Sequence, residues 1–211
     1  MGDTILDLKT ASENMLRNEE FTDMVVSCKG RTWWCHRSVL CPRCPFFKVA
    51  CTSGFTESAT WVIKLDDDDQ EAVDMMLEYL YTLEKPGPLA VALPRPVSAE
   101  RAYFIGDKYD LSILQSAGYS SMEVIARHLL QSWDAKNDVG KSNAISWIRM
   151  VWSWEHDGLK DIRKLCLDRL SGMSATMLDY EPFQELLDDN KKFRIEFIKA
   201  MRKRVWKDHR Y

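Results

Sequence analysis

The sequence lacks the long apolar runs that mark membrane proteins. No stretch of its 211 residues approaches the roughly 18 consecutive apolar residues that a membrane-spanning helix requires. Its first residues, Met1 to Leu6, contain no basic region followed by an apolar stretch, so we expect no secretory signal. These absences predict a protein of the cytoplasm, the nucleus or both, with no membrane partner.

The motifs of common enzyme families are also missing. The nine glycines are scattered singly, so there is no glycine-rich phosphate loop, and neither Gly-x-Ser-x-Gly nor His-Glu-x-x-His occurs. The run Asp66–Asp69 lacks the alternating acids, central glycine and distal glutamate of a calcium loop. It precedes an apolar helical pattern, and carboxylates suit the positive end of a helix dipole. We therefore predict a helix N-terminus there, and a chain that is not an enzyme and holds no cofactor.

Basic charge is not in excess. The formal net charge is −3, so no overall positive field attracts a polyanion, and we expect no nucleic-acid partner. The run from Lys199 to Arg210 is locally basic around Trp206. Such a run is either a nuclear-import or nucleic-acid patch, or else the basic C-terminal end of a helix or a solvated tail. We favour the helix end or solvated tail over the binding patch.

Five of the six cysteines fall within the first 51 residues. In a secreted chain this crowding would indicate disulfides, whereas buried, reduced thiols are expected in a cytosolic chain. Zinc is the alternative, because Cys41 and Cys44 form a C-x-x-C motif with Cys35 and Cys51 nearby. The second ligand pair of a strong zinc motif is missing. We therefore favour core thiols over a site built from Cys35, Cys41, Cys44 and Cys51.

The apolar pattern predicts an α+β domain followed by an all-helical extension. Alternating and β-branched runs predict strands, and apolar residues at helical spacing predict helices. We expect strands at 24–28, 31–36 and 61–65, and helices at 4–18, in two short pieces within 37–51 around Pro42 and Pro45, through Ala72–Tyr81, at 98–109 and at 111–133. From about residue 134 the pattern is helical throughout. Asn137–Lys141 is the best candidate for a boundary segment, and we assign a domain to residues 1–134 and a helical extension to residues 135–211.

Tryptophan is abundant, with eight residues in the chain. Trp147, Trp152 and Trp154 fall in one predicted helix with Ile148 and Val151. Core packing is the default explanation. An exposed patch that binds a partner is the alternative, because tryptophan is enriched at binding hot spots. The sequence leaves both readings open.

Six short motifs, in one order and spacing over about residues 5–130, resemble the BTB/POZ domain. They are Phe21-Thr22-Asp23 before a hairpin, His36-Arg37-Ser38-Val39-Leu40, Cys44-Pro45-Phe46-Phe47, Gly54-Phe55-Thr56-Glu57, Met76-Leu77-Glu78-Tyr79-Leu80-Tyr81-Thr82, and Asp107-Lys108-Tyr109-Asp110-Leu111 with Leu114. The chain looks most like the fungal type, which has a helical C-terminal extension and no Kelch repeats. Some positions depart from the pattern. Cys44 replaces a usual serine, Leu83 replaces a glycine, Gly106 replaces an alanine, and the 86–97 loop is long.

The resemblance implies a small sheet flanked by helices, and a role in protein assembly. Such a module self-associates and recruits other proteins, here also through its helical extension. In dimeric family members, an aspartate at the first strand faces a basic residue near the dimer axis. This basic residue directly follows the histidine of the second motif, which is His36 here. Asp23 and Arg37 occupy these positions. The alternative is an ion pair within one chain.

Cullin-3 is the partner that the resemblance implies beyond a second copy. Family adaptors contact it through an apolar-x-Glu motif before the third strand, and Phe55-Thr56-Glu57 fits this motif. Phe55 would fill a pocket while Glu57 takes a hydrogen bond or a cation. The alternative is that Phe55 belongs to the core and Glu57 is only solvated. A transcriptional scaffold that recruits a corepressor is the alternative function.

Overall fold

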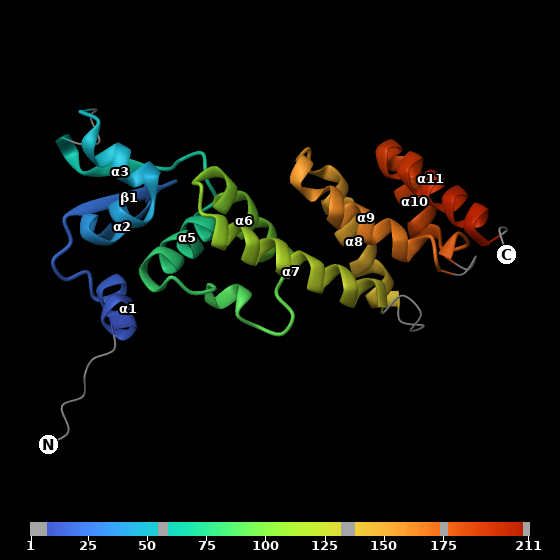
Figure 1. Ribbon diagram of the computed structural model, residues 1–211, viewed down its shortest axis with the longest axis horizontal. Helices are drawn as coiled ribbons and strands as arrows, with labels where there is room; N and C mark the ends of the chain where they lie inside the picture. The colour runs from blue at the N-terminus through green and yellow to red at the C-terminus, as the bar shows by residue number, and fades with distance from the viewer. Residues whose placement is uncertain (1–7, 55–58, 132–137, 174–176, 209–211) are drawn as a thin grey trace, which may run out of the picture. The chain divides into compact units, whose positions relative to one another are not determined.

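A small three-stranded sheet with many helices forms the protein, as a computed structural model shows for residues 8–54, 59–131, 138–173 and 177–208 (Figure 1). The predicted α+β class is confirmed. In chain order the elements are α1 Leu8–Asn18, β1 Met24–Cys28, β2 Arg31–Cys35, α2 Arg37–Arg43, α3 Pro45–Thr52, β3 Val62–Lys64, α5 Gln70–Thr82, η1 Gly87–Leu89, α6 Pro96–Lys108, α7 Ser112–Gln131, α8 Asp138–Ser153, η2 Asp157–Leu159, α9 Lys160–Leu170, α10 Glu181–Asp189 and α11 Lys191–Asp208.

Two compact units make up the chain, residues 1–121 and 122–211, and the division falls inside α7. The boundary predicted between 134 and 135 lies outside the described residues. Within the described ranges, no helix has both the length and the apolar character that crossing a bilayer requires.

The sheet has the order β2-β1-β3, with β1 in the centre. β1 pairs antiparallel with β2 and parallel with β3, which places Val26 between Trp33 and Ile63. The β1–β2 hairpin turns through Lys29 and Gly30, whose φ angles are 47° and 85°. Two positive φ angles match the right-handed twist of a hairpin, and the Lys29 N–H is held by the Asp66 carboxylate at 2.8 Å.

The helices α1, α2 and α6 pack against α5 in the first unit (Figure 1). α5 buries eight of its residues because its apolar positions cover more than one face. Pro45 opens α3, as predicted, whereas Pro42 lies in the last turn of α2 instead of beyond its end. The third strand is shorter than predicted, because Trp61 has a φ of 56° and leaves the extended region.

Aromatic side chains build the core of the second unit. Trp147, Trp152 and Trp154 are all buried, so core packing is the correct one of the two readings left open by the sequence. Phe193 packs edge-on against Trp152, with ring centroids 4.8 Å apart. The Trp152 indole N–H also donates to Glu196 at 3.0 Å, which satisfies its polar atom. Helices α8 and α11 each pack against both α9 and α10.

Candidate functional site

The hairpin brings Asp23 and Arg37 together, and the group of Arg37 that contacts the Asp23 carboxylate is its backbone N–H. The Asp23 carboxylate accepts a hydrogen bond from the Arg37 N–H at 2.7 Å. Arg37 is the first residue of α2, and the residue before it supplies no side-chain cap. Asp23, just before β1, therefore caps α2 at the open end of the hairpin. The Arg37 guanidinium lies over the Trp61 ring, 3.5 Å from its centroid.

A buried histidine joins the start of α2 to the end of α5. The His36 ring Nε2 lies 2.6 Å from the Glu20 carbonyl oxygen, which only accepts, so Nε2 carries the proton. With the proton on Nε2, Nδ1 accepts from the Tyr81 hydroxyl at 2.8 Å, and the Tyr81 oxygen accepts from the His36 N–H at 2.9 Å. Burial raises the pKa of Tyr81, which keeps the hydroxyl protonated for this bond. No sequence pattern indicated this link between residues 45 positions apart, although both residues belong to motifs of the resemblance.

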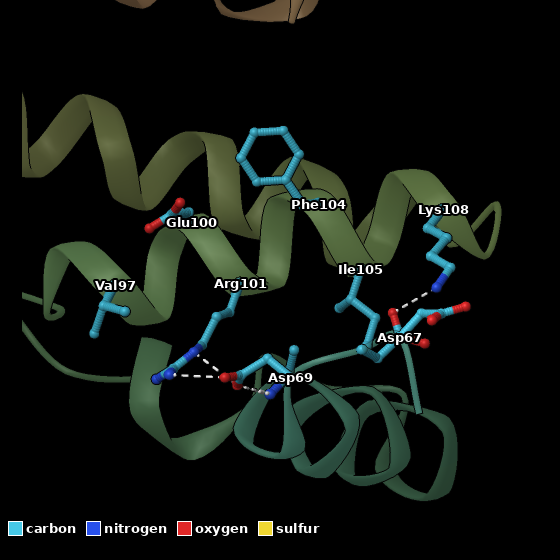
Figure 2. Close-up of a pocket in the computed structure, with 10 residues that line it drawn as sticks. Asp67, Asp69, Val97, Glu100, Arg101, Phe104, Ile105 and Lys108 are labelled. Carbon is cyan, nitrogen blue, oxygen red and sulfur yellow. Dashed lines mark hydrogen bonds and ion pairs between the residues drawn. The ribbon is translucent and has the colours of Figure 1, made fainter. Parts of the chain in front are cut away.

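The acidic turn before α5 is held by side chains from α6 (Figure 2). Asp69 caps α5 by accepting from the N–H groups of Glu71 and Ala72 at 3.0 and 3.1 Å, which confirms the predicted helix N-terminus. Arg101 binds both Asp69 oxygens, at 2.8 and 3.0 Å, in a fork that matches a carboxylate. A groove of about 410 Å³ lies beside this pair.

Asp68 in the same turn is 9% exposed and is held by two partners. Its carboxylate accepts from Lys108 Nζ at 2.7 Å and from the Tyr109 hydroxyl at 2.5 Å. Burial, and then the neighbouring Asp68, raise the pKa of Tyr109, so the phenol stays a donor. These bonds tie the start of α5 to the end of α6.

The positions of the cysteine side chains argue against the zinc alternative. The Cys35 thiol lies beside the Tyr81 hydroxyl, Cys41 lies beside Cys51, and Cys44 lies 3.8 Å from the Tyr109 carbonyl oxygen. Among the residues that the structure describes, no three His, Cys, Asp or Glu side chains are placed to hold a metal. Burial raises the pKa of both Cys35 and Cys41 to about 12, which opposes the thiolates that zinc requires. All six cysteines are free thiols, and five of them are buried, as predicted.

An apolar surface on α3 precedes the segment that carries the predicted cullin contact. Phe46 and Val49 are 38% and 58% exposed, and we call these two side chains the α3 surface. The Phe46 ring packs edge-on against Tyr109, with centroids 4.8 Å apart, and this contact fixes its orientation. α3 ends at Thr52, a few residues before Phe55 and Glu57, which lie outside the described residues.

The first unit thus combines a small sheet, helices joined by buried polar links, and exposed apolar side chains on the surface of α3. The BTB/POZ domain family model matches residues 13–92, and this part of the chain is a BTB/POZ domain. Such a domain is a protein-interaction module and does not belong to an enzyme family. The resemblance read from the motifs is confirmed.

Curated relatives match about a third of the chain. Kelch repeat and BTB domain-containing protein 8 of Mus musculus is 37% identical over 71 residues, which are 33% of this chain and 12% of the relative. Kelch-like protein 40 of Xenopus laevis is 34% identical over 77 residues, 36% of this chain and 12% of the relative. The matched part thus spans about an eighth of the length of these relatives.

Proposed function

We propose that this chain is an adaptor that self-associates through its BTB/POZ domain and binds cullin-3 beside α3, in the cytoplasm, the nucleus or both. The observation that carries the cullin part is the α3 surface. Two apolar side chains stand exposed on the helix that leads directly to Phe55 and Glu57. An exposed apolar patch beside a fitting motif is typical of a binding surface.

The α3 surface suits binding because part of it is already rigid. The Phe46 ring is held by Tyr109 and by Phe47, whose centroid lies 5.4 Å away. A side chain that is fixed before binding loses little conformational entropy on binding. In this proposal Phe55 is the apolar anchor of the contact with cullin-3, and Glu57 makes a polar contact with it.

Calorimetric titration of the full chain with the N-terminal half of cullin-3 tests the cullin contact. We expect the double variant Phe55→Ala, Glu57→Ala to weaken binding by about tenfold or more, and Val49→Ala to weaken it less. Val91→Ala is the matched control, because Val91 is equally exposed but belongs to the 86–97 loop. Absence of binding by the natural sequence, or equal binding by the double variant, would rule out this contact.

Self-association is supported by the surroundings of Asp23. Phe21, two residues earlier in the chain, has a φ of 60° and is 90% exposed, so a large apolar ring stands in water close in sequence to Asp23. Burial of this ring against a second copy would remove apolar surface from water. The charged pair would then be buried as well, and a buried charge is costly unless a partner neutralises it.

Analytical ultracentrifugation of charge variants tests the dimer pocket. Asp23→Asn removes the charge but keeps an oxygen that accepts from the Arg37 N–H, so α2 stays capped. We expect this variant to shift the mass toward the monomer, and the pair Asp23→Asn, Arg37→Gln to recover part of the dimer. Asp179→Asn, an exposed aspartate of the second unit, serves as control. A dimer that is unchanged in Asp23→Asn, or a monomeric natural chain, would exclude the pocket.

A further inference from the structure

A basic groove runs between α9 and α11 in the second unit, with a volume of about 990 Å³. The two helices pack against each other, and residues that line the groove recur along each helix at steps of four. On α9, Lys160, Lys164 and Asp168 follow one another at four-residue steps. Residues four apart lie on one face of a helix, so each helix gives the groove one continuous wall.

The lining is strongly positive although the chain is not. Seven basic and three acidic side chains line the groove, which gives it a net charge of +4, whereas the whole chain carries −3. Five of the cations are exposed, and within the described residues no ion pair joins them to an acid: Lys164, Lys192, Lys199, Lys203 and Arg204. The groove is therefore a local site of positive potential.

Two arginines shape the floor and one end of the groove. Arg163 is 8% exposed, and its guanidinium donates to the carbonyl oxygens of Val151 and Trp154. Because these partners are neutral, its charge adds to the potential in the groove. Arg204 reaches from α11 to Gly172, just after the end of α9. The two residues are so close that a Cβ atom at position 172 would lie 2.5 Å from Arg204 Nη1.

The other lining residues favour a peptide over a nucleic acid. Asp168 and Glu196 would repel a continuous phosphate backbone, but they can accept hydrogen bonds from peptide N–H groups. Leu167 and Ala200 offer apolar contact between the charges. No aromatic ring is among the described side chains that line the groove, so none is available to stack on a base.

We propose that the groove between α9 and α11 binds an acidic peptide segment of a partner protein. α9 has 11 residues and is about 16 Å long, which matches about five residues of extended peptide. The segment carries several aspartates or glutamates that meet the exposed cations, with an apolar side chain between them at Leu167. This site is independent of the cullin contact, since it lies wholly within residues 122–211.

Fluorescence anisotropy tests the proposal with the full chain and a labelled ten-residue peptide rich in Asp and Glu with a central Leu. A peptide with Asn and Gln at the same positions is the ligand control. We expect only the acidic peptide to bind, with an affinity that falls as salt is raised. The variant Lys164→Glu, Lys199→Glu should raise the Kd by about tenfold or more, and Lys164→Gln, Lys199→Gln by less.

The matched protein control reverses two charges elsewhere on α11. Lys191→Glu, Arg202→Glu changes the net charge equally, but neither residue lines the groove, so we expect the Kd to stay within about twofold. Equal weakening by both double variants, or equal binding of the acidic and neutral peptides, would overturn the proposal. A single-stranded oligonucleotide that binds more tightly, and is also lost in Lys164→Glu, Lys199→Glu, would assign the groove to nucleic acid instead.

Discussion

The hydroxyl of Tyr109 offers the sharpest test of how the first unit is held together. Tyr109→Phe removes one oxygen, which donates to the buried Asp68 carboxylate at 2.5 Å. The ring stays, so the packing against Phe46 is kept. Among the residues that the structure describes, Asp68 then keeps only Lys108 as a side-chain partner, at 2.7 Å.

The expected loss follows from the charge on Asp68. A hydrogen bond to an ionised group contributes about 1.5–3 kcal/mol, and a buried carboxylate that loses a donor is not compensated by water. We therefore expect Tyr109→Phe to lower the free energy of unfolding by about 1.5–3 kcal/mol. With a urea slope of about 1–3 kcal/mol per M, the midpoint should fall by about 1 M.

Urea unfolding followed by circular dichroism measures this shift, and hydrogen exchange locates it. Protection should fall in residues 62–82, which carry β3 and α5, and should stay unchanged in residues 181–197 of the second unit. Tyr79→Phe is the matched control. Tyr79 is also a buried tyrosine of this unit, but its hydroxyl has no hydrogen-bond partner among the described residues. Equal midpoints for Tyr79→Phe and Tyr109→Phe would refute the reasoning.

Three further predictions concern backbone fit and pH. Gly106→Ala should destabilise the chain by about 1–3 kcal/mol, because the added Cβ would lie 2.5 Å from the Gln115 backbone nitrogen. An unchanged urea midpoint would contradict this contact. Leu83→Gly should stabilise the chain by up to about 1 kcal/mol, because the exposed Leu83 at the C-terminal end of α5 has a left-handed φ of 57°, which glycine adopts without strain. A lower thermal midpoint for this variant would argue against backbone strain at Leu83. Burial raises the pKa of Cys166 to about 12 from an ordinary value of 9.0, so its contribution to stability is complete below pH 9 and is lost as the pH rises toward 12. Unfolding measured from pH 8 to 11 should show a flatter alkaline decline in Cys166→Ala, and identical slopes would count against the buried thiol as a cause.

The parts of the fold that follow from local pattern were predictable from the sequence. β1 alternates buried and half-buried residues, and Lys29-Gly30 marks the turn, so the hairpin was predicted within one residue of its ends. The helix N-terminus at Asp66–Asp69 was predicted from the helix dipole, and Asp69 confirms it as the N-cap of α5. The recognition of the BTB/POZ domain came from motif order, which local periodicity alone does not give.

Contacts between distant segments were beyond such reasoning. Gly106 departs from the family pattern, and the reason appears only when α7 is seen to approach it backbone to backbone. The resemblance placed Asp23 beside Arg37, but not the use of the Arg37 N–H or the position of its guanidinium over Trp61. Trp61 itself has a left-handed φ of 56°, a conformation that nothing in the sequence around it indicates.

The central place of β1 in a mixed sheet sets an order of assembly. Its antiparallel partner β2 follows after a two-residue turn, whereas its parallel partner pairs Val25 with Val62, 37 positions later. Closing the short loop costs little entropy, and the long crossover through α2 and α3 costs more. We therefore expect the hairpin to form first and to serve as the template onto which β3 docks late in folding.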